Sequence, residues 1–385
     1  MEQIEYDFWA ASLQDGYIGK LVEIVESAGG SQMLYEMSAE DMLNKLHLSG
    51  RMIKHIINRR NTFKTVDEFN RLSKENIRFI RYTDEDYPSR LSNISGKPYA
   101  IFVKGSMPIS DNPSVAIVGA RDCSEYGRLM AEYFGDRLAK CGIQIISGMA
   151  YGIDGIAQMS AIDTGGKSYA VLGNGVDIVY PKANRRLYER LVYENCGGVI
   201  SEYVPGTLAS SRNFPPRNRI ISGLSDLLLV VEAKAKSGTL ITADLAMEQG
   251  RDVCIVPGRI TDPLSVGCIN LMKFGAAPVT SADDILERIS SSTTGEKYDL
   301  SRKINLNVNG NTDMAGSKTV GENRNSNLTD SEKMIMDNLD YYPRSIDDIS
   351  KRTGFDLSKV LSLTTCLEMK GIIKCIGQGS FVKKS

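Results

Sequence analysis

The chain has 385 residues, enough for two or three domains, and its 46 Lys and Arg against 47 Asp and Glu leave a formal net charge of −1. This balance excludes a global charge that would draw the protein to nucleic acid or membrane, so any electrostatic site must be local. Seven cysteines without a Cys-x-x-Cys pair indicate reduced thiols. The only histidines, His47 and His55, nearly exclude a histidine triad or a His-rich zinc site in the central part of the chain. No apolar run is long enough for a membrane span, so we expect a cytoplasmic protein without membrane contact, metal or cofactor.

Residues 1–62 predict a small helical domain of short helices joined by glycine-containing turns. Ser38, followed by Asp41, is typical of a helix start with its cap and an acid in the first turn. The pattern suits a helix-hairpin-helix or SAM-like module that contacts DNA backbone or protein, and it equally suits a packing appendage. Residues 63–113 form a lead-in with a candidate edge strand at Ala100–Val103. The expected helices are Phe8–Leu13, Ile18–Ala28, Ser38–Leu46 and Arg51–Arg60.

From Ser114 to about Ile289, short apolar runs alternate with segments of helical periodicity. Such alternation predicts an α/β fold with a doubly wound parallel sheet, because each parallel strand needs a crossover helix. Helices are expected at Tyr126–Lys140, Arg186–Glu194 and Thr239–Gln249. The expected strands are Val115–Val118, Gln144–Ile146, Tyr169–Leu172, Val199–Ile200, Leu227–Val231 and Val253–Val256.

Residues 290–327 predict a flexible linker, because only five of these 38 residues are Leu, Ile, Val or Phe. Residues 328–385 then predict helices followed by a hairpin, which is the order of a winged-helix domain. This segment carries nine Lys and Arg against eight Asp and Glu. A surface that neutralises duplex phosphates should be more basic, so the composition favours a protein contact or a vestigial role.

Three strand-end loops are candidates for anion binding, because loop amides and helix starts at the carboxyl edge of a parallel sheet present free N–H groups. The dinucleotide motif GxGxxG is absent, since Gly119 and Gly127 stand eight residues apart. A basic cluster at Lys182, Arg185 and Arg186 either widens the zone or is a solvated helix start. The candidate residues of the three loops are Gly119 and Arg121, Ser147 and Gly148, and Ser237, Gly238 and Thr239.

The stretch SSRNFPPRNRIISGLS, at Ser210–Ser225, is the most specific in the chain. It holds three arginines within eight residues without an acid, and arginine binds phosphates through two parallel hydrogen bonds. Phe214 stands beside them, and an exposed aromatic ring stacks on an unpaired base. The alternative is a buried Phe214 with Asn218 and Arg219 as braces, whereas ligand contact is favoured for Arg217. The pattern predicts a site for single-stranded nucleic acid.

Seven motifs, in this order, resemble the DNA processing protein family DprA, also called Smf, over about residues 80–290: IVGARDCSEYG, IISGMAYGID, AVLGNGVDIVYP, ISEYVPG, FPPRNRIISGLS, SGTLITADLAMEQGR and VPG. The resemblance implies a Rossmann-like core that binds single-stranded DNA, forms a homodimer and loads the recombinase RecA during natural transformation. Single-strand-binding protein is a further candidate partner. Gln158 departs from the family, which usually has His there. The resemblance places the DNA pocket on Gly119, Arg121, Ser147, Gly148, Phe214, Arg217, Asn218, Arg219, Ser237, Gly238 and Thr239.

Two rival functions follow from other features. The core also resembles LOG-type nucleotide N-glycosidases, but Ile241 and Thr242 stand where that family has acids. The next acid, Asp244, is displaced along the helix and points elsewhere. No other constellation offers general acid–base chemistry, so the sequence argues against an enzyme. An adaptor without DNA binding is the third alternative.

Overall fold

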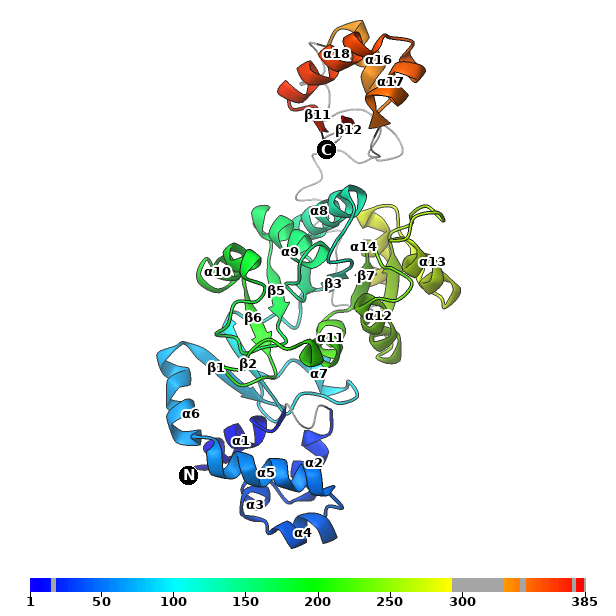
Figure 1. Ribbon diagram of the computed structural model, residues 1–385. Coiled ribbons are helices and arrows are strands. Elements are labelled where there is room, and N and C mark those ends of the chain that lie inside the picture. Colours follow the sequence, from blue (N-terminus) through cyan, green and yellow to red (C-terminus); the bar gives the residue numbers. More distant parts are fainter. Residues whose placement is uncertain (15–18, 293–327, 340–343, 376–378, 384–385) are drawn as a thin grey trace. The chain divides into compact units, whose positions relative to one another are not determined.

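The computed structural model describes residues 1–14, 19–292, 328–339, 344–375 and 379–383, which form two compact units (Figure 1). The larger unit carries the N-terminal helices and the sheet, and the smaller one is built on the C-terminal residues. Apart from its first three residues, the expected linker lies outside the described residues. None of the described helices is both long and apolar enough to cross a membrane.

The larger unit is organised around a nine-stranded sheet with the order β1-β2-β6-β5-β4-β3-β7-β8-β9. The seven strands from β6 to β9 are parallel, while β1 and β2 are antiparallel at one side. The expected doubly wound parallel sheet is therefore confirmed. The strands are β1 Ile77–Arg81, β2 Ala100–Gly105, β3 Ser114–Val118, β4 Gln144–Ser147, β5 Ser168–Val171, β6 Gly197–Ser201, β7 Leu227–Val230, β8 Asp252–Ile255 and β9 Ala277–Pro278.

Strand β3 is central, and all five of its residues are buried, as its apolar run predicts. The chain proceeds from β3 outward through β4, β5 and β6, and later returns to β7 on the other side of β3. The direction of winding thus reverses at β3. A crevice forms outside the carboxyl ends of strands at such a reversal, so the loops after β3, β4 and β7 meet there.

Helices cover both faces of the sheet, and each face has its own hydrophobic core. On one face α7, α11, α12 and α13 contribute buried side chains, and on the other α9, α10 and the N-terminal helices do so.

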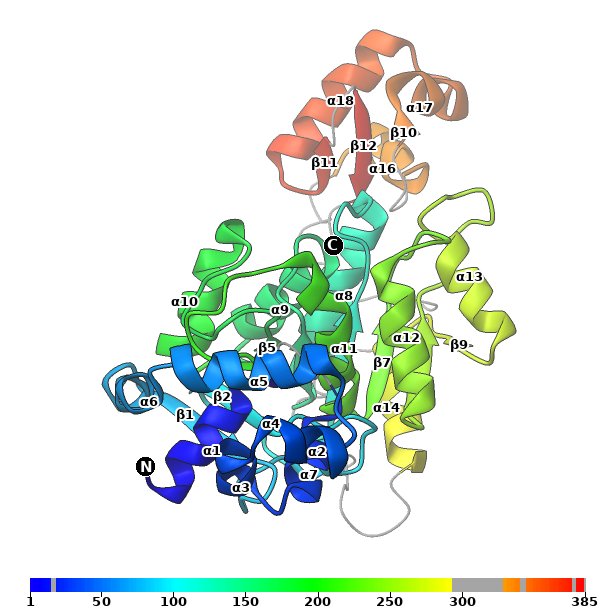
Figure 2. The same cartoon turned by 60° about the horizontal axis from the view of Figure 1, so that its bottom comes forward.

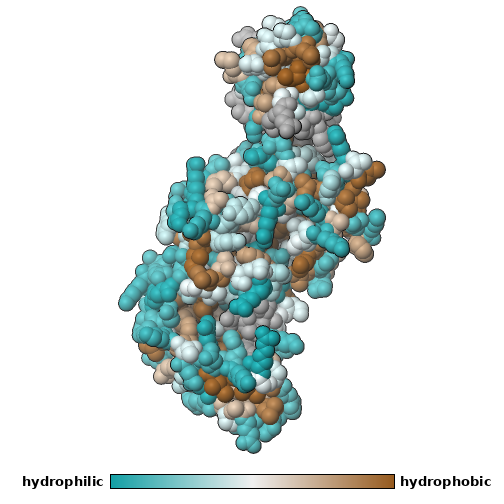
Figure 3. Space-filling model, in the orientation of Figure 1, coloured by the Kyte–Doolittle hydropathy of each residue, from teal (hydrophilic) through white to brown (hydrophobic). Residues whose placement is uncertain are grey.

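The outer surface of these helices is mainly polar. Figure 3 shows hydrophilic residues interspersed with smaller hydrophobic patches on the visible surface. The helices of this part are α7 Ser89–Ser92, α8 Glu125–Lys140, α9 Ile153–Asp163, α10 Arg185–Tyr193, α11 Phe214–Gly223, α12 Gly238–Glu248, α13 Val266–Lys273 and α14 Ala282–Ser292, with 3-10 turns at Lys182–Asn184 and Ser211–Asn213.

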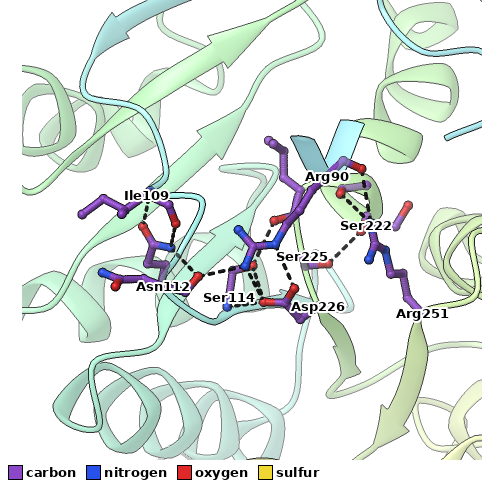
Figure 4. A network of polar contacts seen from close by, with 11 residues as sticks. Arg90, Ile109, Asn112, Ser114, Ser222, Ser225, Asp226 and Arg251 are labelled. Carbon is purple, nitrogen blue, oxygen red and sulfur yellow. Dashed lines mark hydrogen bonds and ion pairs between the residues drawn. The ribbon is translucent and has the colours of Figure 1, made fainter. Parts of the chain in front are cut away.

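A network of polar contacts fixes the amino-terminal ends of β3 and β7 (Figure 4). The Arg90 guanidinium donates Nε to Asp226 Oδ1 at 2.8 Å and Nη2 to Asp226 Oδ2 at 2.9 Å. The main-chain N–H of Ser114 donates to Asp226 Oδ2 at 2.8 Å, and Arg90 also donates to the Asn112 carbonyl. The lead-in segment is therefore tied to the edge of the sheet opposite the strand-end loops.

The N-terminal helices share a core with the sheet (Figure 2). The Phe8 ring meets those of Phe79 and Phe102 edge-on, with centroids 5.6 and 5.9 Å apart, and Arg81 pairs with Asp7 at 2.6 Å. The core thus runs across the expected boundary at residue 62. The helices are α1 Gln3–Ala11, α2 Leu21–Ser27, α3 Ser31–Glu36, α4 Ala39–Asn44, α5 Gly50–Thr62 and α6 Thr65–Lys74.

The elements that sequence periodicity missed include α3, α6, β1, β9 and α11, the last of which was expected to be a loop. The candidate edge strand at Ala100–Val103 forms as β2, but β1 pairs outside it and takes the edge. Strand β1 was missed because its sequence, IRFIR, is only five residues long, and its neighbouring Phe79 and Ile80 break the alternation of apolar and polar residues that marks a strand. The cap at Ser38 is confirmed, since its hydroxyl accepts from the Asp41 N–H at 3.0 Å.

The smaller unit has the expected winged-helix order. Among the residues described for this unit, three helices surround a core that includes Ile335, Ile349, Val360 and Leu367. Ser345 and Asp356 cap the second and third helices by accepting from main-chain N–H groups. The elements are α16 Asp330–Asp337, β10 Arg344–Ser345, α17 Ile346–Thr353, α18 Leu357–Met369, β11 Ile373–Cys375 and β12 Ser380–Lys383, with β12 in the centre of the three-stranded sheet.

The shared core generates a stability prediction. Phe8→Ala removes a ring that is 1% exposed, so the free energy of unfolding of the larger unit should fall by about 3–5 kcal/mol. Urea denaturation monitored by circular dichroism measures it, with Met33→Ala as the control because Met33 is 55% exposed. A separate early transition of the N-terminal helices, with an unchanged main transition, would contradict a shared core.

Candidate nucleic-acid interface

An open pocket of about 390 Å³, counting space continuous with solvent, lies at the carboxyl edge of the parallel strands. Residues from the loops after β3, β4 and β5 and from the start of α11 line it. Four of the expected site residues are among them: Arg121, Gly148, Phe214 and Arg217. The full lining is Arg121, Gly148, Ala150, Tyr151, Leu172, Gly173, Asn174, Tyr180, Pro181, Phe214 and Arg217.

The inner wall of the pocket is built on the guanidinium of Arg217, a residue that is 4% exposed. Its Nη1 donates to the Gly148 carbonyl at 3.1 Å and to the Val171 carbonyl, and its Nε donates to Asn218 Oδ1 at 3.2 Å. Arg217 therefore ties α11 to the carboxyl ends of β4 and β5. It lines the pocket and braces it at the same time.

Burial lowers the pKa of Arg217 to about 10, and the Asp154 carboxylate opposes this shift. Burial also raises the pKa of Asp154, whose Oδ2 accepts from the Gly148 N–H at 3.1 Å. A Cβ on Gly148 would stand 2.8 Å from both Arg217 Nη2 and Asp154 Oδ2. Gly148 is thus required because the ends of the buried Arg217 and Asp154 side chains occupy the space where its own side chain would begin.

Aromatic rings form the outer wall. Phe214 stacks on Tyr180, with centroids 5.6 Å apart and planes inclined by 19°. The Arg121 guanidinium lies over the Phe214 ring at 5.4 Å, and the side chain of Arg121 is exposed. Tyr151 and Tyr180 are 48% and 42% exposed. Rings that are packed on one side and open on the other can stack on an additional planar group.

The third expected loop, at Ser237–Thr239, lies outside the pocket lining. It is joined to the site by two contacts: Thr239 Oγ1 donates to the Gly119 carbonyl at 3.1 Å, and Asn218 Nδ2 donates to the Gly238 carbonyl at 3.5 Å. A Cβ on Gly119 would stand 2.6 Å from the Ile153 side chain. Gly119 therefore packs on α9, and the loop at 237–239 supports the rim.

The structure places two expected residues in the interior instead of the pocket. Ser147 is fully buried, and its hydroxyl donates to the Ile117 carbonyl at 2.6 Å, which links β4 to β3. Arg219 is 5% exposed and pairs with Glu202 through two hydrogen bonds of 2.7 and 2.5 Å. Burial opposes the charge of Arg219, but the Glu202 carboxylate holds its pKa above the usual value. This is the geometry of the bracing alternative for Arg219.

Sequence reasoning missed the two tyrosines and Asp154. The motifs SGMAYGID and GNGVDIVYP contain these three residues, but only small residues of the first motif, such as Gly148, indicated a binding site. A tyrosine in a strand-end loop is a usable signal, because an aromatic residue outside the core is available for stacking. Asp154 left no such signal, since its partner Arg217 lies 63 positions away in the sequence.

The strand-end loops concentrate positive charge although the chain as a whole is neutral. Glu202 and Glu232 in these loops are buried, and Asp177 pairs with Arg71. In the described loops after β3 to β8, Asp122 is exposed and Asp262 is half-buried. The exposed basic residues of the same loops are Arg121, Lys182, Arg212, Lys234, Lys236 and Arg259.

The family model described as DNA recombination-mediator protein A matches residues 78–290, and that of the DprA winged helix domain matches residues 322–378. DNA processing protein DprA of Streptococcus pneumoniae is 45% identical over 217 residues, which are 56% of this chain and 76% of the relative. Protein Smf of Escherichia coli is 42% identical over 218 residues, which are 57% of this chain and 58% of the relative.

Two solved structures share the fold. That of DprA from Streptococcus pneumoniae superposes with a TM-score of 0.62 at 36% identity, over 74% of this chain and 98% of the other. That of DNA processing protein A from Helicobacter pylori gives a TM-score of 0.51 at 25% identity, over 57% and 98%. The latter protein is described as having a single-stranded DNA binding mode.

The bracing geometry of Arg219 predicts a large loss of stability. Arg219→Ala leaves the Glu202 carboxylate buried without its cation, so the free energy of unfolding should fall by about 3–5 kcal/mol. Urea denaturation measures it, and Arg185→Ala is the matched control, because Arg185 and Glu189 form an exposed pair at 3.7 Å. An Arg219→Ala protein as stable as the control would contradict the bracing role.

Proposed function

Since the chain belongs to the DNA recombination-mediator protein A family, which includes the proteins called DprA and Smf, we propose that its pocket binds single-stranded DNA without sequence choice. The observation that carries the proposal is the exposed Arg121 guanidinium above the stacked rings of Phe214 and Tyr180. This arrangement brings a group that can bind a phosphate and an aromatic surface together in one place.

The chemistry of the site separates single strands from duplexes. An unpaired base can leave its neighbours and stack on Phe214, Tyr180 or Tyr151, whereas a duplex base is already stacked and paired. Arg121 supplies a guanidinium that binds a phosphate through two hydrogen bonds. Neither contact reads a base edge, so binding is independent of sequence. Arg217 contributes indirectly, because its hydrogen bonds to the Gly148 and Val171 carbonyls hold α11, and with it Phe214, in place.

The strand leaves the pocket along the basic edge of the sheet. Pro181 lines the pocket, and the exposed Lys182, Arg185 and Arg186 follow it at the start of α10. These three charges stand at the positive end of a helix without an acid in its first turn, an arrangement that a bound phosphate would stabilise. On the other side, Arg212 is exposed two residues before Phe214.

Family membership supports a further step, in which a homodimer of the chain delivers the bound strand to RecA, with single-strand-binding protein as a second partner. RecA filament assembly on strands coated with single-strand-binding protein, with and without this chain, measures that step.

The proposed binding mode predicts a strand preference and a salt dependence. A short oligonucleotide should bind more tightly as a single strand than as a duplex. If three to five phosphates are neutralised, the slope of log affinity against log salt for the single strand should be roughly −2 to −4. Fluorescence anisotropy at several salt concentrations measures both quantities, and equal affinity for the two forms would contradict the proposal.

Arg121 is the residue with which to test the phosphate contact. Arg121→Ala should weaken single-strand binding by about 1.5–3 kcal/mol, the range for a hydrogen bond to a charged group. The melting temperature should stay the same because the side chain is exposed. Arg121→Lys should restore only part of the affinity, since lysine lacks the planar fork. Preserved affinity together with a melting temperature lowered by several degrees would make Arg121 a brace.

A further inference from the structure

We infer that Arg71, on helix α6, is a positioning residue for the pocket: it holds the loop that presents Tyr180. Helices α1 to α6 are together called the N-terminal module below. The expected effect, tighter binding of single-stranded DNA when the Arg71–Asp177 pair is intact, rests on the proposed function. The structural part of the inference, the restraint of residues 173–181 by α6, can be measured without DNA.

Arg71 reaches the pocket loop through one ion pair. Its Nη2 donates to Asp177 Oδ2 at 2.5 Å, and the Asp177 side chain is 13% exposed. Arg71 also pairs with Glu75 at 2.7 Å and Glu68 at 2.9 Å on its own helix. These two carboxylates hold the guanidinium in the orientation in which it reaches the loop.

Asp177 connects Arg71 to the main chain of a second loop. Its Oδ1 accepts from the Gly206 N–H at 2.9 Å, so one carboxylate joins α6 to the loop after β5 and to the loop after β6. Tyr180 follows three residues later, and its ring stacks on Phe214. A loop that moves at Asp177 would therefore change the distance between the two rings.

A second contact from the N-terminal module reaches the residues that support the other ring, Phe214. Gln14 Nε2 donates to Glu202 Oε2 at 2.6 Å, and Glu202 pairs with Arg219, which lies five residues after Phe214 on α11. The supports of both rings thus meet the same module. Its helices share a core with the sheet, so they form a rigid base for the two contacts.

Adhesion of the module to the sheet is the alternative role for the Arg71–Asp177 pair. In that case Arg71→Ala would lower the melting temperature and leave the affinity per folded molecule unchanged. If Arg71 is a positioning residue, Arg71→Ala should weaken DNA binding and base stacking even at temperatures where the variant is fully folded. The two roles therefore give different results in one set of measurements.

The test uses the full chain as wild type, Arg71→Ala, Asp177→Asn and the double variant, with a single strand that carries 2-aminopurine. Asp177→Asn keeps an oxygen for the Gly206 N–H and loses the charge. Each single variant should bind about fivefold more weakly and quench 2-aminopurine less, because a partly exposed ion pair contributes about 1 kcal/mol. The double variant should bind no more weakly than either single one. Arg78→Ala, which removes an exposed arginine from β1, should bind as wild type does.

Hydrogen exchange on the protein without DNA gives a second readout. Residues 173–181 should exchange faster in Arg71→Ala than in wild type, while residues 238–248 of α12 should not change. Wild-type affinity in both single variants, or effects that multiply in the double variant, would overturn the inference. If the wild type does not bind single strands, the proposed function fails, and unchanged exchange at 173–181 would then overturn the positioning role by itself.

Discussion

The pocket depends on a guanidinium buried at the carboxyl ends of two parallel strands. Arg217 donates to the carbonyls of Val171 and Gly148, and its guanidinium and the Asp154 carboxylate both lie beside Gly148. Removal of a charge from water is costly, so the arrangement is stable only because carbonyl oxygens and a carboxylate surround the cation. These contacts fix the orientation of α11, and with it the position of Phe214 one turn earlier on the same side of the helix.

Charge separation over short distances explains how a neutral chain can present a basic edge. The acids near the site are used internally: Glu202 neutralises Arg219, and Asp177 neutralises Arg71. Arg121, in contrast, is exposed above an aromatic ring. Net charge therefore says little about such a protein, because burial decides which charges a ligand can meet.

The N-terminal helices illustrate a limit of local pattern. Their short amphipathic segments predict a module of their own, and most of them do form near the expected positions. Their apolar residues, however, pack against Phe79 and Phe102 of the sheet instead of closing a separate core. Helices this short are marginal alone, so the surface on which they pack determines whether they form a domain or part of a larger one.

The sequence by itself determined the parallel sheet, the positions of its strands β3 to β8 and the edge at which the loops meet, because these follow from apolar runs and their alternation with helical segments. It also determined that Arg121 and Phe214 lie at that edge. Only the tertiary structure decided the roles of Arg217 and Arg219. They stand two positions apart on α11, and about 100° of rotation per residue turns them to different sides of the helix. One meets the carbonyls after β4 and β5, the other meets Glu202, and these partners are distant in sequence. The role of a buried charge depends on the groups that surround it. Because these groups are distant in sequence, the local pattern around Arg217 and Arg219 cannot show that their roles differ.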